Sequence, residues 1–157
     1  MRAGIGYDVH PLGEGRSLIL GGVQIPFPLG LEGHSDADVL LHAIMDALLG
    51  AAAQGDVGSH FPPDDPRYLG ISSLLLLQEV AGLLEKIKFT IQNIDSIIVA
   101  QKPRLSPYIQ AMRRNIAGAL NLEENLISVK ATTTEKLGFT GEGKGIAAYA
   151  IAMLVKK

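Results

Sequence analysis

The chain has no cysteine and no tryptophan, and only 5% of its 157 residues are aromatic. Without cysteine it forms neither disulfide bonds nor thiolate metal sites. The scarcity of aromatic rings, beside 47% hydrophobic residues and 18 glycines, favours close packing of small side chains over large aromatic clusters. A chain without cysteine is compatible with a reducing compartment, and we expect a cytoplasmic protein.

Long apolar runs and a charge excess are also absent. The longest apolar run covers residues 146–155, about half of the roughly 20 residues that span a bilayer. The first residues do not have the pattern of a signal peptide. The formal net charge of −2 gives no basic excess that would favour nucleic acid. We therefore expect one domain over residues 1–157, with neither a nucleic-acid nor a membrane partner.

Apolar periodicity predicts an α/β (α+β) fold. Strands are expected over residues 2–9, 93–101, 127–133 and 145–155, with a hairpin over 17–26 that turns at Gly21 and Gly22. Helices are expected over 35–53, 72–86 and 106–120, with serine N-caps at Ser35, at Ser72 or Ser73, and at Ser106. This order predicts a mixed sheet with helices on one face. The other face must also be covered, and in a chain of this size an oligomer is the natural cover.

The most informative feature is a possible metal site. Asp8 and His10 are two residues apart on a predicted strand, so their side chains point to the same face. His42 lies on a predicted helix, one turn from Asp38 and one turn from Asp46. A carboxylate and two imidazoles suit a zinc-like divalent ion and leave a fourth coordination position open. Spacing alone does not bring the three side chains together, and a surface carboxylate paired with a histidine is the plain alternative.

Two segments have the chemistry to bind phosphate. His34 and Ser35 come just before a predicted helix N-terminus, where free N–H groups favour anions. The alternative is that Ser35 only caps the helix and His34 is solvated. Three threonines over residues 132–134 end a strand before Glu135. Their hydroxyls and backbone could bind phosphate oxygens while Glu135 holds a hard cation such as Mg²⁺, but an ordinary strand end explains them equally.

Three other segments are less specific. Residues 100–106 join a strand to a helix and could wrap a nucleotide, with Lys102 or Arg104 near phosphate, or form a solvated connection. Residues 55–68 are rich in proline and aspartate and are expected to form a loop or lid, with His60 at the surface. The glycine-rich run over 138–145 fits neither a P-loop nor a dinucleotide-binding pattern, and a turn is expected there.

Taken together and in order, three blocks resemble the 2-C-methyl-D-erythritol 2,4-cyclodiphosphate synthase family. The blocks are GYDVH at 6–10, GHSDADVLLHAIMDALLGAAAQGDVGSHFP at 33–62 and KATTTEKLGFTGEGKGIAA at 130–148. The resemblance implies a phosphorus–oxygen lyase of non-mevalonate isoprenoid biosynthesis. Its substrate would be 4-diphosphocytidyl-2-C-methyl-D-erythritol 2-phosphate, whose 2-phosphate attacks the β-phosphorus and releases CMP. It also implies a homotrimer with active sites between neighbouring subunits.

The same resemblance implies the roles of individual residues. Zinc or another divalent ion would bind Asp8, His10 and His42, and a second ion, Mg²⁺ or Mn²⁺, would bind Glu135 and the diphosphate. His34 and Thr133 match positions that stabilise the transition state. Positions that match substrate contacts, some of them in a cytidine pocket from the adjacent subunit, are Ser35, Asp56, Gly58, Phe61, Asp65, Ala100, Pro103, Arg104, Leu105, Ala131, Thr132 and Phe139.

Three residues depart from the family pattern. Pro63 stands where a carboxylate is common, and Arg104 stands where lysine is common, which keeps the charge but changes its geometry. Glu142 stands where many members have an arginine, which in some of them is associated with isoprenoid diphosphate in a cavity along the trimer axis. Like charges repel, so we expect weak or no binding of such a ligand.

The residues by themselves leave three classes of function open. One is the cyclodiphosphate synthase, and a second is a metal-dependent phosphohydrolase that uses zinc-bound water on a related phosphorylated substrate. The third is a trimeric binding module with structural zinc, which is disfavoured because closed structural sites need four protein ligands and three are visible. The resemblance decides for the synthase.

Overall fold

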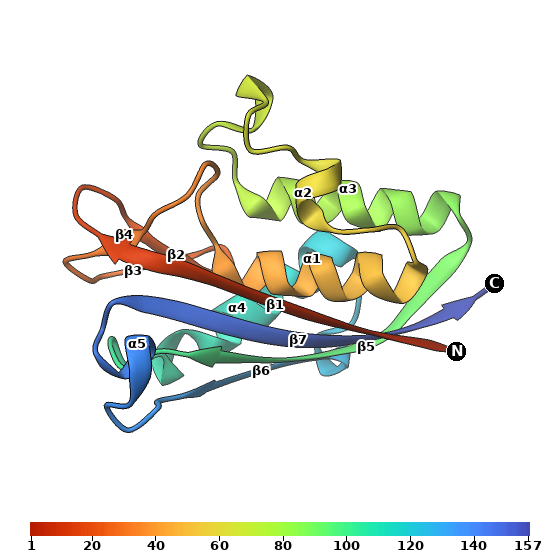
Figure 1. Ribbon diagram of the computed structural model, residues 1–157. Helices are drawn as coiled ribbons and strands as arrows, with labels where there is room; N and C mark the ends of the chain where they lie inside the picture. The colour runs from red at the N-terminus through yellow and green to blue at the C-terminus, as the bar shows by residue number, and fades with distance from the viewer.

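A five-stranded mixed sheet forms the centre of the structure, a computed structural model that describes all 157 residues (Figure 1). Its strands lie side by side in the order β4-β1-β7-β5-β6. Neighbouring strands are antiparallel except β5 and β6, which are parallel. The sheet strands are β1 Arg2–Gly13, β4 Gly30–Leu31, β5 Phe89–Val99, β6 Ile127–Thr132 and β7 Gly145–Lys156. The predicted hairpin, β2 Leu18–Leu20 with β3 Val23–Ile25, pairs separately.

The three long helices, α1 Val39–Ala52, α3 Ser73–Lys86 and α4 Ile109–Leu120, cover one face of this sheet. The short helices are α2 Val57–His60 and α5 Gly138–Gly141, which lies at the end of β7, and the 3₁₀ turns are η1 Pro66–Tyr68, η2 Ser106–Tyr108 and η3 Glu124–Leu126. Figure 1 shows α1 directly over the sheet and α3 stacked above α1. The predicted α+β fold with a mixed sheet is therefore confirmed. None of the helices is both long enough and apolar enough to cross a membrane.

The opposite face of the sheet carries a row of exposed apolar side chains. The row consists of Ile5, Tyr7 and Val9 on β1 and Tyr149 and Ile151 on β7. Tyr7 and Tyr149 are direct partners across the two strands, and their ring centroids are 4.7 Å apart. A contiguous apolar surface of this kind is typical of an interaction site.

Small residues bring α1 very close to β1. A Cβ atom at Gly6 would lie 1.8 Å from the carbonyl oxygen of Ala43, and one at Gly4 would lie 2.0 Å from that of Ala47. Because those neighbours are backbone atoms, no side-chain rotation could relieve the clash. The composition predicted such close packing. This packing holds β1 and α1, which carry the candidate metal ligands, next to each other.

The first helix begins at Val39 rather than at Ser35, and the prediction that Ser35 is its N-cap is wrong. The N-cap is Asp38, whose Oδ1 accepts from the backbone N–H of Leu41 at 3.2 Å. The same carboxylate accepts from the N–H groups of Gly21 and Gly22, at 3.0 and 2.7 Å. Burial raises the pKa of Asp38 to about 6, although these N–H donors favour the charged form. The hairpin turn thus decides where the helix begins.

Other element ends also differ from prediction. Ser106 and Pro107 open the turn η2 instead of capping α4, which begins at Ile109. β5 begins at Phe89, four residues before the predicted start at residue 93. A register shift between Ile91 and Asn93 interrupts the two-residue alternation there, so the pattern did not indicate the first part of the strand. The expected loop over 55–68 contains α2 and η1, and the expected turn over 138–145 contains α5. The short strand β4 was not predicted.

Candidate active site

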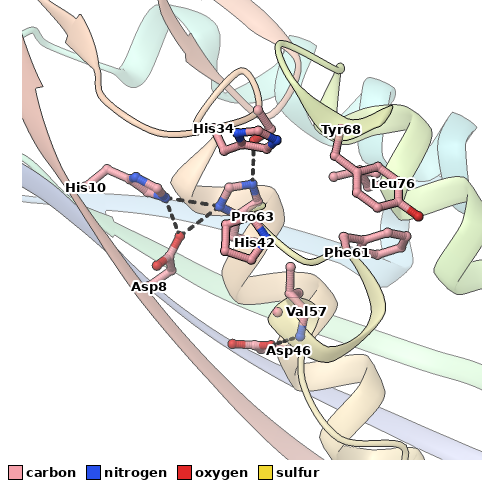
Figure 2. Close-up of a pocket in the computed structure, with 12 residues that line it drawn as sticks. Asp8, His10, His34, His42, Asp46, Val57, Phe61, Pro63, Tyr68 and Leu76 are labelled. Atoms are coloured by element: carbon pink, nitrogen blue, oxygen red, sulfur yellow. Dashed lines mark hydrogen bonds and ion pairs between the residues drawn. The ribbon is translucent and has the colours of Figure 1, made fainter. Parts of the chain in front are cut away.

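The structure brings Asp8, His10 and His42 together at one point (Figure 2). Asp8 Oδ2 lies 2.9 Å from His10 Nε2 and 2.9 Å from His42 Nδ1, and the two nitrogens are 3.1 Å apart. Ligand atoms around a tetrahedral zinc ion with bonds of about 2.0 Å are about 3.3 Å apart. The three atoms therefore fit a divalent ion with little movement, and the possible site that the sequence indicated has the right geometry.

The charge of the triad suits a cation. Burial would raise the pKa of Asp8, but hydrogen bonds with His10 and His42 and their charges hold this pKa well below its usual range. Burial would lower the pKa of His10, but the Asp8 carboxylate raises it. Asp8 is therefore ionised at neutral pH, and the triad supplies one negative charge and two imidazoles.

The remaining ring nitrogens are also engaged. His10 Nδ1 lies 2.6 Å from the carbonyl oxygen of Glu32, which can only accept, so this nitrogen carries a hydrogen and Nε2 is the nitrogen that would bind an ion. His42 Nε2 lies 3.2 Å from Ser35 Oγ and 3.1 Å from Ser73 Oγ. Neither carboxylate one helical turn from His42 in the sequence binds its ring: Asp38 caps α1, and the Asp46 carboxylate accepts from the N–H of Val57 at 2.8 Å.

The triad forms one side of a cavity of about 340 Å³. In Figure 2, Phe61, Tyr68 and Leu76 lie across the cavity from Asp8 and His10. Four predicted site residues outside the triad also line this cavity. His34, Ser35, Gly58 and Phe61 line the cavity together with Asp46, Val57 and Pro63. The site thus combines a charged corner with an apolar wall.

A second cavity, of about 820 Å³, contains most of the other predicted residues. Eight of them line it: Ala100, Pro103, Arg104, Leu105, Ala131, Thr132, Thr133 and Glu135. The hydroxyl of Thr133 donates to the Glu135 carboxylate at 2.8 Å, so these two side chains act as a pair. Lys102, the basic residue singled out with Arg104, lines this cavity too. One chain therefore holds the two halves of the predicted site in separate cavities.

Three predicted substrate-binding residues line neither cavity. Asp56 caps α2 and accepts from Ser59 N at 2.8 Å, beside the first cavity. Asp65 pairs with Arg67, and its carbonyl oxygen lies 3.0 Å from His34 Nε2. Phe139 lies on α5 and is half exposed. His60, expected at the surface, contacts the carbonyl oxygen of Gln54 at 2.8 Å and lines neither cavity.

The sequence did not indicate the residues that fix the backbone around this site by hydrogen bonds. Arg16 donates to the carbonyl oxygens of Gly33 and Ser35, at 2.5 and 2.6 Å, and so fixes the backbone on both sides of His34. Asp36 binds Ser73 at the start of α3. These contacts join positions 17 to 37 residues apart, and no local pattern marks them.

A model of the YgbB family matches residues 1–155 of the chain. The chain belongs to the YgbB family. Relatives named 2-C-methyl-D-erythritol 2,4-cyclodiphosphate synthase include that of Pelotomaculum thermopropionicum, 61% identical over 99% of this chain and 96% of the relative. That of Clostridium novyi is 60% identical over the full length of both proteins. The resemblance based on the three sequence blocks is thus confirmed.

Solved structures agree with this assignment to the YgbB family. The bifunctional IspDF of Campylobacter jejuni matches with a TM-score of 0.96 at 46% identity, over 99% of this chain and 42% of that longer one. The Plasmodium falciparum IspF, solved as a CDP complex, matches with a TM-score of 0.86 at 37% identity, over 99% of this chain and 96% of that one. These relatives give no support to the phosphohydrolase or to the binding module.

Proposed function

We propose that the chain converts 4-diphosphocytidyl-2-C-methyl-D-erythritol 2-phosphate into 2-C-methyl-D-erythritol 2,4-cyclodiphosphate and CMP. About 60% identity over full length to enzymes of that name supports this function. The observation that carries it in the structure is the Asp8, His10 and His42 triad on the wall of a cavity. We assign the reaction to one domain over residues 1–157. A cytoplasmic location is part of the proposal, since such charged metabolites do not cross a bilayer unaided.

The reaction suits the side chains that the structure offers. The 2-phosphate oxygen attacks the β-phosphorus, the bond from that phosphorus to the CMP oxygen breaks, and an eight-membered ring closes. The nucleophile belongs to the substrate, so the protein has to position two phosphates and offset their repulsion. We propose zinc for the triad and Mg²⁺ or Mn²⁺ for Glu135, where each ion would neutralise phosphate charge as a Lewis acid.

We propose the following roles for the chain's own residues. His34 and Thr133 donate to phosphate oxygens as charge moves to them. Ser35, Asp56, Gly58, Phe61 and Asp65 contact the methylerythritol phosphate end of the substrate. The cytidine end is held by Ala100, Pro103, Arg104, Leu105, Ala131 and Thr132, and Phe139 is a further substrate contact. The first set lies in or beside the first cavity, and most of the second lines the second cavity.

We further propose that the enzyme is a homotrimer. Two features of the chain support it. His34 and Thr133 line different cavities of one chain, and neighbouring copies that bring two such cavities together would offer both to one substrate. The apolar row on the open face of the sheet, which includes Ile5 with 72% of its surface exposed, needs a cover. A closed ring of copies would supply the cover and would place the second cavity of one subunit against the first cavity of the next.

The products distinguish this reaction from hydrolysis. The protein is incubated with the cytidyl substrate, zinc and Mg²⁺ in ¹⁸O-labelled water, and the phosphorus products are followed by ³¹P NMR. We expect CMP and a cyclic diphosphate with two coupled phosphorus signals and no solvent oxygen, and we expect neither after EDTA treatment. Linear phosphates that contain ¹⁸O would contradict the proposed function.

Replacing Glu135 with alanine tests the two-ion arrangement. We expect turnover to fall by about 10² to 10³, as when one electrostatic stabiliser is removed, while zinc content stays unchanged. Turnover and metal content are measured on the same preparation, with the exposed Glu85→Ala on α3 as a control. Loss of zinc in Glu135→Ala would place this carboxylate at the triad instead.

Glu142 bears on a possible second ligand. It forms an exposed ion pair with Lys144 at 2.5 Å, so the positive charge of that lysine is already engaged. We expect geranyl diphosphate to raise the melting temperature by less than about 1 °C, because a ligand stabilises a protein only in proportion to its binding. A concentration-dependent rise that Glu142→Ala abolishes would contradict this prediction.

A further inference from the structure

The second ring nitrogen of His42 decides whether this residue is able to bind an ion. Its Nδ1 faces Asp8 and His10, and its Nε2 faces two hydroxyls, Ser73 Oγ at 3.1 Å and Ser35 Oγ at 3.2 Å. A neutral imidazole has one hydrogen and two nitrogens. Nδ1 offers a lone pair to an ion only if the hydrogen is on Nε2. Whatever fixes that hydrogen on Nε2 prepares the site.

The hydroxyl of Ser73 has its single hydrogen committed elsewhere. Asp36 Oδ1 lies 2.5 Å from Ser73 Oγ, and Asp36 Oδ2 accepts from the backbone N–H of Ser73 at 2.9 Å. An ionised carboxylate accepts only, and a distance of about 2.5 to 2.7 Å is normal for a hydroxyl that donates to one. Ser73 Oγ therefore donates to Asp36 and has only lone pairs left for His42. This favours the tautomer in which His42 Nε2 is the donor, against the opposing pull of Asp8 Oδ2, which lies 2.9 Å from Nδ1 and also only accepts.

We propose that Asp36 and Ser73 are positioning residues that hold His42 in the tautomer with the hydrogen on Nε2 and the lone pair on Nδ1. They form a chain from carboxylate to hydroxyl to imidazole that ends at the triad. Metal-bound histidines generally donate their second N–H to such a partner. Here the carboxylate acts through an intervening hydroxyl. The inference rests on the metal site proposed above.

The fold holds this chain of groups in place. Ser73 is fully buried and is the first residue of α3, so its hydroxyl does not exchange hydrogen bonds with solvent. The backbone N–H of Asp36 donates to the carbonyl oxygen of Ile71 at 3.0 Å, and that of Gly70 donates to His34 at 2.8 Å. These two bonds fasten the segment before α1 to the start of α3. The helix N-terminus also favours a carboxylate at this place.

Ser35 provides a matched control. It offers a hydroxyl to the same His42 nitrogen at nearly the same distance, and it accepts from the N–H of Ala37 at 3.2 Å. No carboxylate binds its hydroxyl hydrogen, so Ser35 Oγ is free either to donate to His42 or to accept from it. If a hydroxyl neighbour were enough, the two serines would be equivalent. If the carboxylate determines the tautomer, only Ser73 and Asp36 matter for ion affinity.

The test measures zinc affinity and the tautomer rather than turnover. The zinc Kd is determined by chelator competition for wild type, Asp36→Asn, Ser73→Ala and Ser35→Ala, and ¹⁵N NMR locates the His42 hydrogen in the zinc-free proteins at alkaline pH. We expect the Kd to rise about 10- to 100-fold in Asp36→Asn and Ser73→Ala and less than about threefold in Ser35→Ala. We also expect a larger share of the hydrogen on Nδ1 in Asp36→Asn and Ser73→Ala than in wild type, because Asp8 Oδ2 then competes for it alone.

The possible failures are distinct. Wild-type protein that binds no zinc would contradict the proposed metal site itself. Normal zinc binding in wild type, with an unchanged Kd in both Asp36→Asn and Ser73→Ala, would overturn the positioning role. So would a share of the hydrogen on Nδ1 that is no larger in Asp36→Asn and Ser73→Ala than in wild type. If Asp36→Asn fails to fold, Ser73→Ala and the wild-type spectrum still decide, because Ser73→Ala keeps the backbone N–H that binds Asp36.

Discussion

Replacing His42 with alanine is expected to abolish zinc binding and to lower turnover by at least about 10³, without changing the oligomeric state. The magnitude follows from the several kcal/mol that a Lewis acid contributes to charge stabilisation, at about 1.4 kcal/mol for each factor of ten. Asp8→Asn should act in the same way, because it keeps the shape of the side chain but removes the one negative charge of the triad. Zinc content and steady-state turnover are the measurements.

The appropriate control is a histidine outside the triad. His60 contacts a backbone carbonyl of Gln54 and lines neither cavity, so His60→Ala should keep zinc and most of the turnover. Comparing the two alanine variants separates loss of a metal ligand from general loss of a histidine. Full zinc occupancy in Asp8→Asn or His42→Ala would show that the triad is not the zinc site.

A single methyl group on Gly6 is expected to damage both stability and the metal site. Its Cβ would lie 1.8 Å from the Ala43 carbonyl oxygen and 2.8 Å from the Ala47 nitrogen, so α1 would have to move away from β1. Overpacking of this kind costs about 1 to 3 kcal/mol, and a clash with backbone belongs at the upper end or beyond. Because β1 carries Asp8 and His10 and α1 carries His42, zinc affinity should fall with stability.

Gly82 in α3 is the matched control for Gly6. A Cβ at Gly82 meets nothing within 4 Å, so Gly82→Ala should gain about 0.5 to 1 kcal/mol from the helix propensity of alanine. Urea unfolding of both variants at one protein concentration, together with zinc Kd values, measures the two effects. A Gly6→Ala protein with wild-type stability and zinc affinity would mean that the close approach of α1 to β1 does not position the ligands.

The sequence predicted the structure correctly where a local hydrophobic period determines which face a side chain lies on or where a helix ends. The two-residue alternation of β1 placed Asp8 and His10 on one face, and the structure has them there. The helical period over the first helix placed its last residues almost correctly. Nothing local indicated that His42 meets the other two ligands. That contact depends on Gly6 and the alanines of α1, which let the helix approach the strand.

Where two residues were equally suited to be the N-cap of a helix, tertiary contacts determined which of them is the cap. Serine and aspartate are both good N-caps, and Ser35 and Asp38 are three residues apart. Asp38 caps α1 because the N–H groups of Gly21 and Gly22 also bind its carboxylate, and this contact is invisible in the sequence. The hydrogen bonds between Asp36 and Ser73 could not be predicted from the sequence for the same reason. It spans 37 residues and connects two elements by a side chain.

We propose that one active centre is built from two cavities on different copies of the chain. The triad and His34 line the first cavity, while Thr133, Glu135 and the predicted cytidine contacts line the second. Each cavity alone lacks half of the groups that the proposed reaction uses. A monomer would therefore hold all the residues and still be inactive.

Subunit complementation tests this claim most directly. Differently tagged His42→Ala and Glu135→Ala chains are co-expressed, and hybrid oligomers carrying both tags are purified and assayed. In every hybrid trimer, one of the three shared sites combines an intact first cavity with an intact second one, so activity should recover to about a third of wild type. Hybrids no more active than the two parent variants would contradict an active centre shared between subunits.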